Sequence, residues 1–396
     1  MSTSIHPLRL LLKAVVLFVA LNLLFAWWNP SIGKLSLYNL LWPGRLRFPY
    51  STAPGYHIRD YNVALTEDLD GLFSSHIISA GPKPTDEFRI ILLGDSAAWG
   101  GRVRADETLA AQITALGLTS CDGRRVVAYN LAYPWPSVLR DLLILEYALD
   151  YHPDLVLWLI TLNGLHRKNE DMEFLLPNAD RLQRIAQTHR LTLPAAPYSR
   201  RAPPSLWERT PIAQRKRLKN LLMNQIYGLM WTATRHDNGF ATPSDHAVVP
   251  PDVSDKLNYL HYPNPDKRSK LIDSLLLDAI RVGQEMAKPA SVVVINEPIF
   301  IATGKNREIR YNRLYPRWAY DAYRQTLAEW MDRHAYPYYD LWNALPPDDF
   351  ANDLVHRDPK GEAHLASLLR PILQKFICRQ SFHGILPHSY AQETDR

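Results

Sequence analysis

Residues 88–100 read FRIILLGDSAAWG. A β-rich run, 88–93, with Arg89 as its one charged residue, stops at Gly94-Asp95-Ser96, and small residues suited to the start of a helix follow. This order of strand, turn and helix is typical of a parallel sheet, in which ligands bind at the carboxyl ends of the strands. The stretch therefore predicts an α/β fold with the hydroxyl of Ser96 at the edge of the sheet where function lies.

The same order recurs along the chain. Further β-rich runs lie at 125–130, 154–161, 291–296 and 336–341. Helical segments are expected at 106–116, 137–150, 267–287, 316–334 and 360–376. Strands that alternate with helices in this way predict a doubly wound, flavodoxin-like parallel sheet of five strands.

One gap in this alternation is too long for a crossover connection. About 100 residues separate the third apolar run from the next helix, which predicts an insertion over 165–265. Apolar residues at helical spacing within 218–230 follow the basic run 215–217. We expect this amphipathic helix to be a lid packed on the domain, with contact to a membrane surface as the alternative. The expected boundaries are 1–29 for a cytoplasmic tip and membrane anchor, 30–87 for a juxtamembrane arm, 88–376 for the α/β domain and 377–396 for a tail.

The N-terminal region contains a long apolar segment. Residues 10–28 read LLLKAVVLFVALNLLFAWW, which is long enough to cross the hydrocarbon core of a bilayer. Arg9 and Lys13 stand at its start, so the positive-inside rule predicts a single span with a cytoplasmic N-terminus and a periplasmic or extracellular domain. A cleaved signal peptide is the alternative. The bulky exit, with Trp27 and Trp28, lacks the small residues that a signal peptidase requires and favours an uncleaved anchor.

Charge and cysteine content narrow the class of protein further. The net charge is +5, and the stretch from Arg190 to Lys219 carries eight Lys or Arg residues against the single acid Glu208. A basic patch beside a membrane segment is typical of contact with anionic lipid or glycan, and no nucleic-acid-binding motif is present. The two cysteines, Cys121 and Cys378, form no CxxC pair. One disulfide in an oxidising compartment and two buried thiols both remain open.

A second polar motif follows the fifth strand. Asp353-Leu354-Val355-His356 is the only Asp-x-x-His sequence in the chain. A serine hydroxyl needs a base within hydrogen-bond reach, and that base needs a carboxylate to fix its tautomer. At the same edge of the sheet as Ser96, His356 and Asp353 can meet these two needs. The three residues are therefore candidates for a catalytic triad.

Asn163, directly after the third strand, is expected at the same edge, where its amide can donate to an oxyanion. Asn-Gly is also a common turn pair, so a purely structural role stays open. The histidines are scattered without the spacing of a metal site, and no cofactor-binding motif is present; we predict no metal and no cofactor.

These motifs, in this order, resemble the SGNH (GDSL-type) hydrolases over roughly residues 88–376. The resemblance implies Ser96 as nucleophile, His356 as base and Asp353 as its orienting acid. It also implies an oxyanion hole formed by the N–H of Ser96 and by Asn163. The segment 130–136 lacks the glycine of the family's second motif. Because the prolines on either side of Trp135 cannot donate, the N–H of Trp135 is the expected substitute.

The resemblance also implies a substrate class. The anchored SGNH-like proteins that it most resembles work beside membrane-bound O-acyltransferases, so the expected substrate is a small acyl ester on a cell-envelope glycan or lipid-linked glycan. Membrane lipid, through the N-terminal helix, is an expected partner, and a membrane-bound O-acyltransferase is a further one. Hydrolysis and acyl transfer stay open, and so does a catalytically inactive SGNH-like partner of such an acyltransferase.

Overall fold

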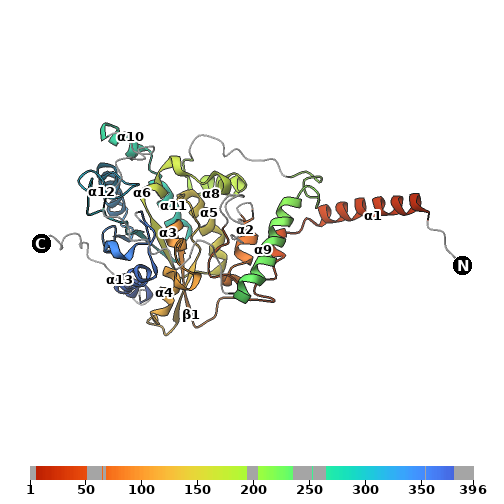
Figure 1. Ribbon diagram of the computed structural model, residues 1–396, viewed down its shortest axis with the longest axis horizontal. Helices are drawn as coiled ribbons and strands as arrows, with labels where there is room; N and C mark the ends of the chain where they lie inside the picture. The colour runs from red at the N-terminus through yellow and green to blue at the C-terminus, as the bar shows by residue number, and fades with distance from the viewer. Residues whose placement is uncertain are drawn as a thin grey trace.

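The apolar runs form the sheet that their pattern predicts. The computed structural model describes residues 6–50, 65, 68–193, 204–234, 252, 265–352 and 354–378. Within these residues one sheet has the parallel order β2-β1-β3-β4-β5, which confirms the flavodoxin-like topology (Figure 1). Its strands are β1 (Glu87–Leu93), β2 (Arg125–Asn130), β3 (Leu155–Ile160), β4 (Ser291–Asn296) and β5 (Tyr338–Asp340).

Alternate residues of the central strands pack into two different cores. Ile91 and Leu93 of β1 join one cluster with helices α5, α11 and α12, whereas Ile90 and Leu92 join a second cluster with α4 and α13. Every residue of β1 and β3 is buried, as expected for a parallel sheet with helices on both faces. The order of the strands reverses at β1, which lies between β2 and β3, and in parallel sheets the carboxyl end of a strand at such a switch point is where ligands bind.

The α-helices in the described residues are α1 (Pro7–Trp28), α2 (Leu69–Ser74), α3 (Ser96–Trp99), α4 (Leu109–Ala115), α5 (Val138–Ala148), α6 (Leu162–Leu165), α7 (Met172–Leu175), α8 (Ala179–His189), α9 (Arg215–Thr234), α10 (Arg268–Asp273), α11 (Leu277–Met286), α12 (Arg317–Arg333) and α13 (Pro359–Ile377). Short 3-10 helices are η1 (Ile32–Lys34), η2 (Ile77–Ser79), η3 (Ala105–Glu107), η4 (Leu149–Tyr151), η5 (Arg167–Asn169), η6 (Pro265–Lys267) and η7 (Pro347–Asp349).

The single helix predicted over 267–287 is wrong in one respect, because the structure divides it into α10 and α11. The three residues between them pair with the segment that follows α6. The N–H of Leu276 donates to the carbonyl of Leu165, and the N–H of Arg167 donates to the carbonyl of Ser274, both at 2.9 Å. These bonds take the backbone groups that a continuous helix would need.

The predicted insertion contains three helices in its described part. Helix α8 packs on α5, and α9 covers the amphipathic segment noted in the sequence. Helix α9 packs on the arm next to η1, beside the base of α1, and is set apart from α3 and α6 in Figure 1. The structure therefore places this helix against the arm, where the sequence led us to expect a lid on the domain.

The arm is part of the folded domain. Two parallel backbone β-bridges fasten the arm, one between Arg45 and His76 and the other between Arg47 and Asn130 at the end of β2. Arg47 and Phe48 are fully buried. The arm thus contacts the carboxyl end of β2, the last strand at that side of the sheet.

Helix α1 and the disulfide mark the two ends of the described chain. Helix α1 is long and apolar enough to cross a membrane, a character that membrane anchors and signal sequences share. Within it only Asn22 and Ala26 are buried.

Cys121 and Cys378 form a disulfide, which joins the turn after α4 to the end of α13 and answers the question that the sequence left open. The tail beyond Cys378 lies outside the described residues.

Candidate active site

The turn after β1 is shaped by a glycine. Gly94 has a φ of +151°, and a Cβ at this position would lie 2.8 Å from Cβ of Ala98 and 2.9 Å from the carbonyl oxygen of Leu159. A side chain is therefore excluded on grounds of both conformation and space. Asp95 caps α3, since its Oδ1 accepts from the N–H of Ala97 at 2.9 Å. Ser96 is the first residue of α3 and its hydroxyl is left to contact another part of the chain.

The hydroxyl of Ser96 meets the imidazole of His356. Oγ of Ser96 lies 2.9 Å from Nε2 of His356, which comes from the loop before α13. Gly101 makes room for this contact, because a Cβ there would lie 3.2 Å from Cδ2 of His356. The structure thus brings together two residues, 260 positions apart, that the sequence singled out separately.

The surroundings of His356 keep its ring neutral. Burial, with a smaller contribution from the positive charges of Arg102 and Arg357, lowers the pKa of His356 to about 3. A neutral imidazole is the form that can accept a proton from a hydroxyl. At neutral pH the ring is therefore in the protonation state that a general base requires.

The other ring nitrogen of His356 faces Asn352, a residue that the sequence analysis did not identify. Nδ2 of Asn352 lies 2.7 Å from Nδ1 of His356. Its Oδ1 accepts from the N–H groups of Leu354 and His356 at 3.1 and 3.2 Å, which sets the orientation of the amide. Asp353, predicted as the orienting acid, lies outside the described residues.

Arg357 ties the His356 loop to the Ser96 turn. Its guanidinium is fully buried, donates to the carbonyl of Ala97 at 3.1 Å and forms ion pairs with Glu297 at 3.1 Å and Glu362 at 3.2 Å. Burial raises the pKa of Glu297 well above its usual range. These contacts join α3, the end of β4 and α13, so Arg357 is well placed to position the Ser96–His356 pair.

A second buried arginine holds the loop after β2. Arg140 of α5 donates to the carbonyls of Pro134 at 2.8 Å, Gly94 at 3.1 Å and Trp135, and it pairs with Asp141 at 2.7 Å. It therefore links this loop directly to the turn that carries Ser96. No spacing in the sequence identifies Arg140, because its partners are mainly backbone carbonyls.

Trp135 lies in that loop with a left-handed backbone, φ +74°, which is uncommon for a bulky residue. Its side chain is 62% exposed, and Nε1 donates to the hydroxyl of Tyr50 at 2.9 Å. Tyr133, in contrast, is buried. Trp135 is thus an exposed aromatic surface on the loop that Arg140 fastens to the nucleophile turn.

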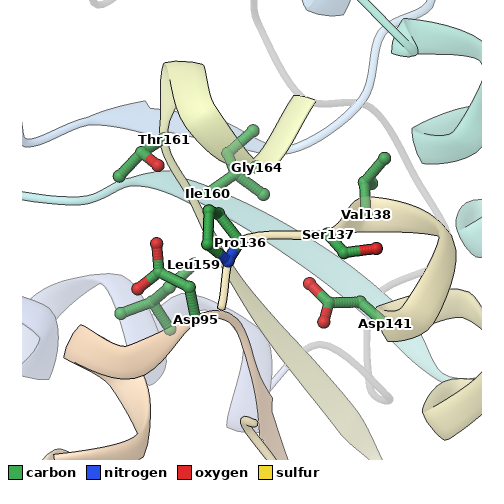
Figure 2. Close-up of a pocket in the computed structure, with 9 residues that line it drawn as sticks. All are labelled: Asp95, Pro136, Ser137, Val138, Asp141, Leu159, Ile160, Thr161 and Gly164. Atoms are coloured by element: carbon green, nitrogen blue, oxygen red, sulfur yellow. The ribbon is translucent and has the colours of Figure 1, made fainter. Parts of the chain in front are cut away.

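Asn163 lies in α6, directly after β3 and at the same edge of the sheet. A small pocket lies beside this point and is lined by Asp95, Pro136, Ser137, Val138, Asp141, Leu159, Ile160, Thr161 and Gly164. Figure 2 shows Asp95 and Asp141 on either side of Pro136, with Thr161 and Gly164 beyond. The roles of Asn163 and Trp135 in an oxyanion hole stay predictions.

The arm also reaches the site. Nη1 of Arg47 donates to the carbonyls of Gly100 at 2.6 Å and Val103 at 3.0 Å, and its guanidinium lies 4.2 Å from the ring centre of Trp99. Nε1 of Trp99 donates in turn to the carbonyl of Phe48 at 2.9 Å. The arm therefore fixes the loop that carries Gly101 and Arg102 beside His356.

The chain is only distantly similar to known proteins. No known protein family and no curated protein matches the chain. Among solved structures, a carbohydrate acetylesterase family member from Sinorhizobium meliloti is 10% identical with a TM-score of 0.33, over 73% of this chain and 98% of that one. The protein TesA is 9% identical with a TM-score of 0.36, over 73% and 99%. An extracellular lipase from Streptomyces rimosus is 14% identical with a TM-score of 0.30, over 72% and 98%.

Proposed function

We propose that the protein is a serine-dependent acyl-ester enzyme in which Ser96 forms a covalent acyl intermediate. One observation carries the proposal, the 2.9 Å contact between Oγ of Ser96 and Nε2 of His356 at the carboxyl edge of the sheet. A serine hydroxyl is a weak nucleophile unless a base within this distance removes its proton. The neutral ring of His356 supplies that base.

The reaction has two steps. Oγ of Ser96 attacks the acyl carbonyl carbon while Nε2 of His356 takes its proton. The tetrahedral intermediate then breaks its bond to the alcohol oxygen, which leaves with the proton from Nε2. In the second step water or a sugar hydroxyl attacks the acyl-serine, gives its proton to Nε2, and Ser96 recovers its own. Asp353 is the acid that orients His356 in this scheme.

The oxyanion of each tetrahedral intermediate accepts from the N–H of Ser96, the side chain of Asn163 and the N–H of Trp135. If so, Asn163→Ala lowers kcat by about 10²-fold to 10³-fold with little change in KM, because this bond strengthens mainly in the transition state. An unchanged kcat with a lowered melting temperature would instead make Asn163 a turn residue.

An exposed aromatic residue near Ser96 supports the proposed substrate class. Trp135 offers an exposed indole on the loop next to Ser96, a surface on which a sugar ring can stack. The proposed substrate is a small acyl group on a cell-envelope glycan or lipid-linked glycan. Trp135→Ala then raises KM for a glycan ester more than for a small aryl ester, which lacks the sugar.

The proposed location is outside the cytoplasm, on a single membrane span formed by α1. Arg9 and Lys13 at the start of α1 favour a cytoplasmic N-terminus, and the Cys121–Cys378 disulfide fits an oxidising compartment. Protease added to intact spheroplasts is expected to digest the domain. Protection of the domain, or a mature N-terminus beyond Trp28, contradicts this topology.

Fluorophosphonate labelling tests the proposal directly. Wild-type protein is expected to be labelled at Ser96, and Ser96→Ala or His356→Ala to lose both labelling and esterase activity. The double variant should lose little more than either single one, because the two residues act as a unit. Acyl groups recovered on an added acceptor glycan indicate transfer, whereas free acid indicates hydrolysis.

A second candidate is a catalytically inactive partner of a membrane-bound O-acyltransferase. One observation favours it, since the amide of Asn352 contacts Nδ1 of His356, the ring nitrogen that a carboxylate orients in a catalytic triad. Under this alternative wild-type protein does not react with the fluorophosphonate, and Ser96→Ala keeps full function in cells.

A further inference from the structure

Two separate segments expose leucine and isoleucine side chains at the end of the domain nearest α1. In the arm, Leu40 and Leu41 form a turn and are 74% and 66% exposed. In α9, Leu222, Ile226 and Leu229 are 60%, 47% and 59% exposed. We refer to these five residues as the apolar face. Soluble surfaces rarely gather so many large apolar side chains without a partner.

The two segments are packed together. The hydroxyl of Tyr38 donates to the carbonyl of Asn224 at 3.0 Å, and the N–H of Leu37 donates to Oε1 of Gln225 at 2.7 Å. At Gly228 a Cβ would lie 2.2 Å from the hydroxyl oxygen of Tyr38, so the glycine permits this close approach. The side of α9 that meets the arm is thus distinct from the side that carries the apolar face.

The exposed side of α9 changes character along its length. Arg215, Lys219, Leu222, Ile226 and Leu229 are all exposed and are spaced alternately by four and three residues. This spacing places them in one row on a helix. The row is basic in the first turns and apolar afterwards. Such a row suits the boundary between charged lipid headgroups and acyl chains.

The charge on the two segments that carry the apolar face is mainly positive, although Asp68 at the start of α2 pairs with Arg217 of α9 at 2.7 Å. Residues 6–50 contain no Asp or Glu, and residues 204–234 contain only Glu208. Lys34 of the arm is exposed, as are Arg215, Lys216 and Lys219 of α9. An anionic surface is therefore the complementary partner.

The position of α1 identifies that partner. Figure 1 shows α9 across the base of α1, whereas α13 lies at the opposite end of the molecule. Helix α1 leads directly into the arm, so the arm lies close to any bilayer that α1 crosses. We propose that the apolar face and the basic turns of α9 dock on the anionic lipid surface of that bilayer.

This docking goes beyond the proposed acyl chemistry and does not depend on it. A single helix leaves a domain free to rotate about the helix axis. Contacts through the arm turn and through α9 fix which side of the domain faces the lipid. They therefore set the distance and direction of the Ser96 edge relative to the membrane.

Lipid-borne quenchers test the docking on the full chain in vesicles of phosphatidylcholine and phosphatidylglycerol. Both native cysteines are in the disulfide, so a single introduced cysteine carries the fluorophore. The probes are Leu41→Cys and Ile226→Cys, with Leu17→Cys in α1 as a reference for insertion. Gln374→Cys, exposed on α13, is the matched control. Nitroxide lipids are expected to quench both face probes at least roughly twofold more than the control.

The outcomes separate the docking from the anchor. Quenching at 17 without quenching at 41 and 226 overturns the docking while the anchor stands. Quenching at 41 and 226 without quenching at 17 supports the docking and contradicts the anchor, and no quenching at any of the three contradicts both. A probe at 226 that is shielded from water but unquenched means that protein covers the face, which also overturns lipid docking.

Lipid charge gives an independent readout. Arg215→Gln combined with Lys219→Gln keeps the apolar residues and removes two positive charges from the row. Quenching at Ile226→Cys is expected to fall in this variant and to fall in wild type when phosphatidylglycerol is omitted. Quenching that is the same with and without anionic lipid refutes the electrostatic part of the proposal.

Discussion

Nδ2 of Asn352 lies 2.7 Å from Nδ1 of His356, on the side of the ring opposite Ser96. An amide N–H that donates to Nδ1 leaves the ring proton on Nε2, where it faces the serine. A general base needs the reverse tautomer, with the lone pair of Nε2 towards the hydroxyl. A carboxylate at Nδ1 produces that tautomer, which makes the position of Asp353 decisive.

The first prediction compares these two neighbours. If Asp353 orients His356 during catalysis, Asp353→Asn lowers kcat by about 10³-fold to 10⁴-fold. Asn352→Ala is the matched variant. It removes hydrogen bonds to the N–H groups of Leu354 and His356 and should cost about 1–2 kcal/mol of stability with a small effect on kcat. Steady-state kinetics and thermal melts distinguish the two, and the opposite order of kcat values would assign the orienting role to Asn352.

The second prediction concerns the acid side of the pH profile. Burial and the charges of Arg102 and Arg357 lower the pKa of His356 to about 3, so kcat/KM should stay level as the pH falls through the ordinary histidine range near about 6.5. Arg102 is exposed, and Arg102→Gln should move the acid limb upward, less so at high salt. Arg104→Gln, an exposed neighbour, should not. A wild-type profile that falls near the ordinary histidine pKa contradicts the prediction.

The third prediction concerns Glu170, which lies beside the pocket and accepts from Oγ of Ser137 at 2.6 Å. Burial raises the pKa of Glu170 from 4.5 to about 8. The folded state therefore holds this proton more tightly than the unfolded state. The contribution of the protonated Glu170 carboxyl to stability is complete below about pH 4.5 and is lost as the pH rises to about 8.

Glu170→Gln cannot titrate, so the melting temperature of wild type should fall relative to this variant between pH 4.5 and 8. Glu173→Gln, exposed in the same segment, is the control and should follow wild type. A constant difference between wild type and Glu170→Gln across this range would show that Glu170 is ionised in the folded protein.

The sheet was predictable because each strand is an apolar run with clear ends, and β2 and β4 have the predicted bounds. Helix α8 was missed, since its sequence ADRLQRIAQTH offers only a narrow apolar stripe at Leu182, Ile185 and Ala186. The break between α10 and α11 depends on pairing with the segment after α6, which no local pattern reveals.

The residues of the candidate site also fall into two groups, those that the sequence predicted and those that it did not. Ser96 and His356 were found because each belongs to a short motif at the end of a strand. Asn352, Arg357 and Arg140 were missed because their partners are mostly backbone groups or charges far away in the chain. The arm had no periodic pattern, and its importance lies in contacts made by single residues such as Arg47.

The last prediction concerns the contacts of Arg47 with the loop that follows α3. Arg47 is fully buried, and Nη1 donates to the carbonyls of Gly100 and Val103 at 2.6 and 3.0 Å. The loop between these carbonyls carries Gly101, which packs against His356. Arg47→Lys keeps the charge but loses the planar fork, so it cannot hold both carbonyls and stack on Trp99 as the guanidinium does.

Arg47→Lys should therefore lower the melting temperature and also lower kcat about 10-fold, with KM nearly unchanged, because a loosened loop displaces His356 from Ser96. Arg45→Lys is the control, since Arg45 is buried on the same arm and its Nε donates to the carbonyl of Arg47 at 3.4 Å. It should lower the melting temperature with little effect on kcat. If both variants lose stability and neither loses kcat, the arm supports the fold alone and Arg47 does not position the catalytic pair.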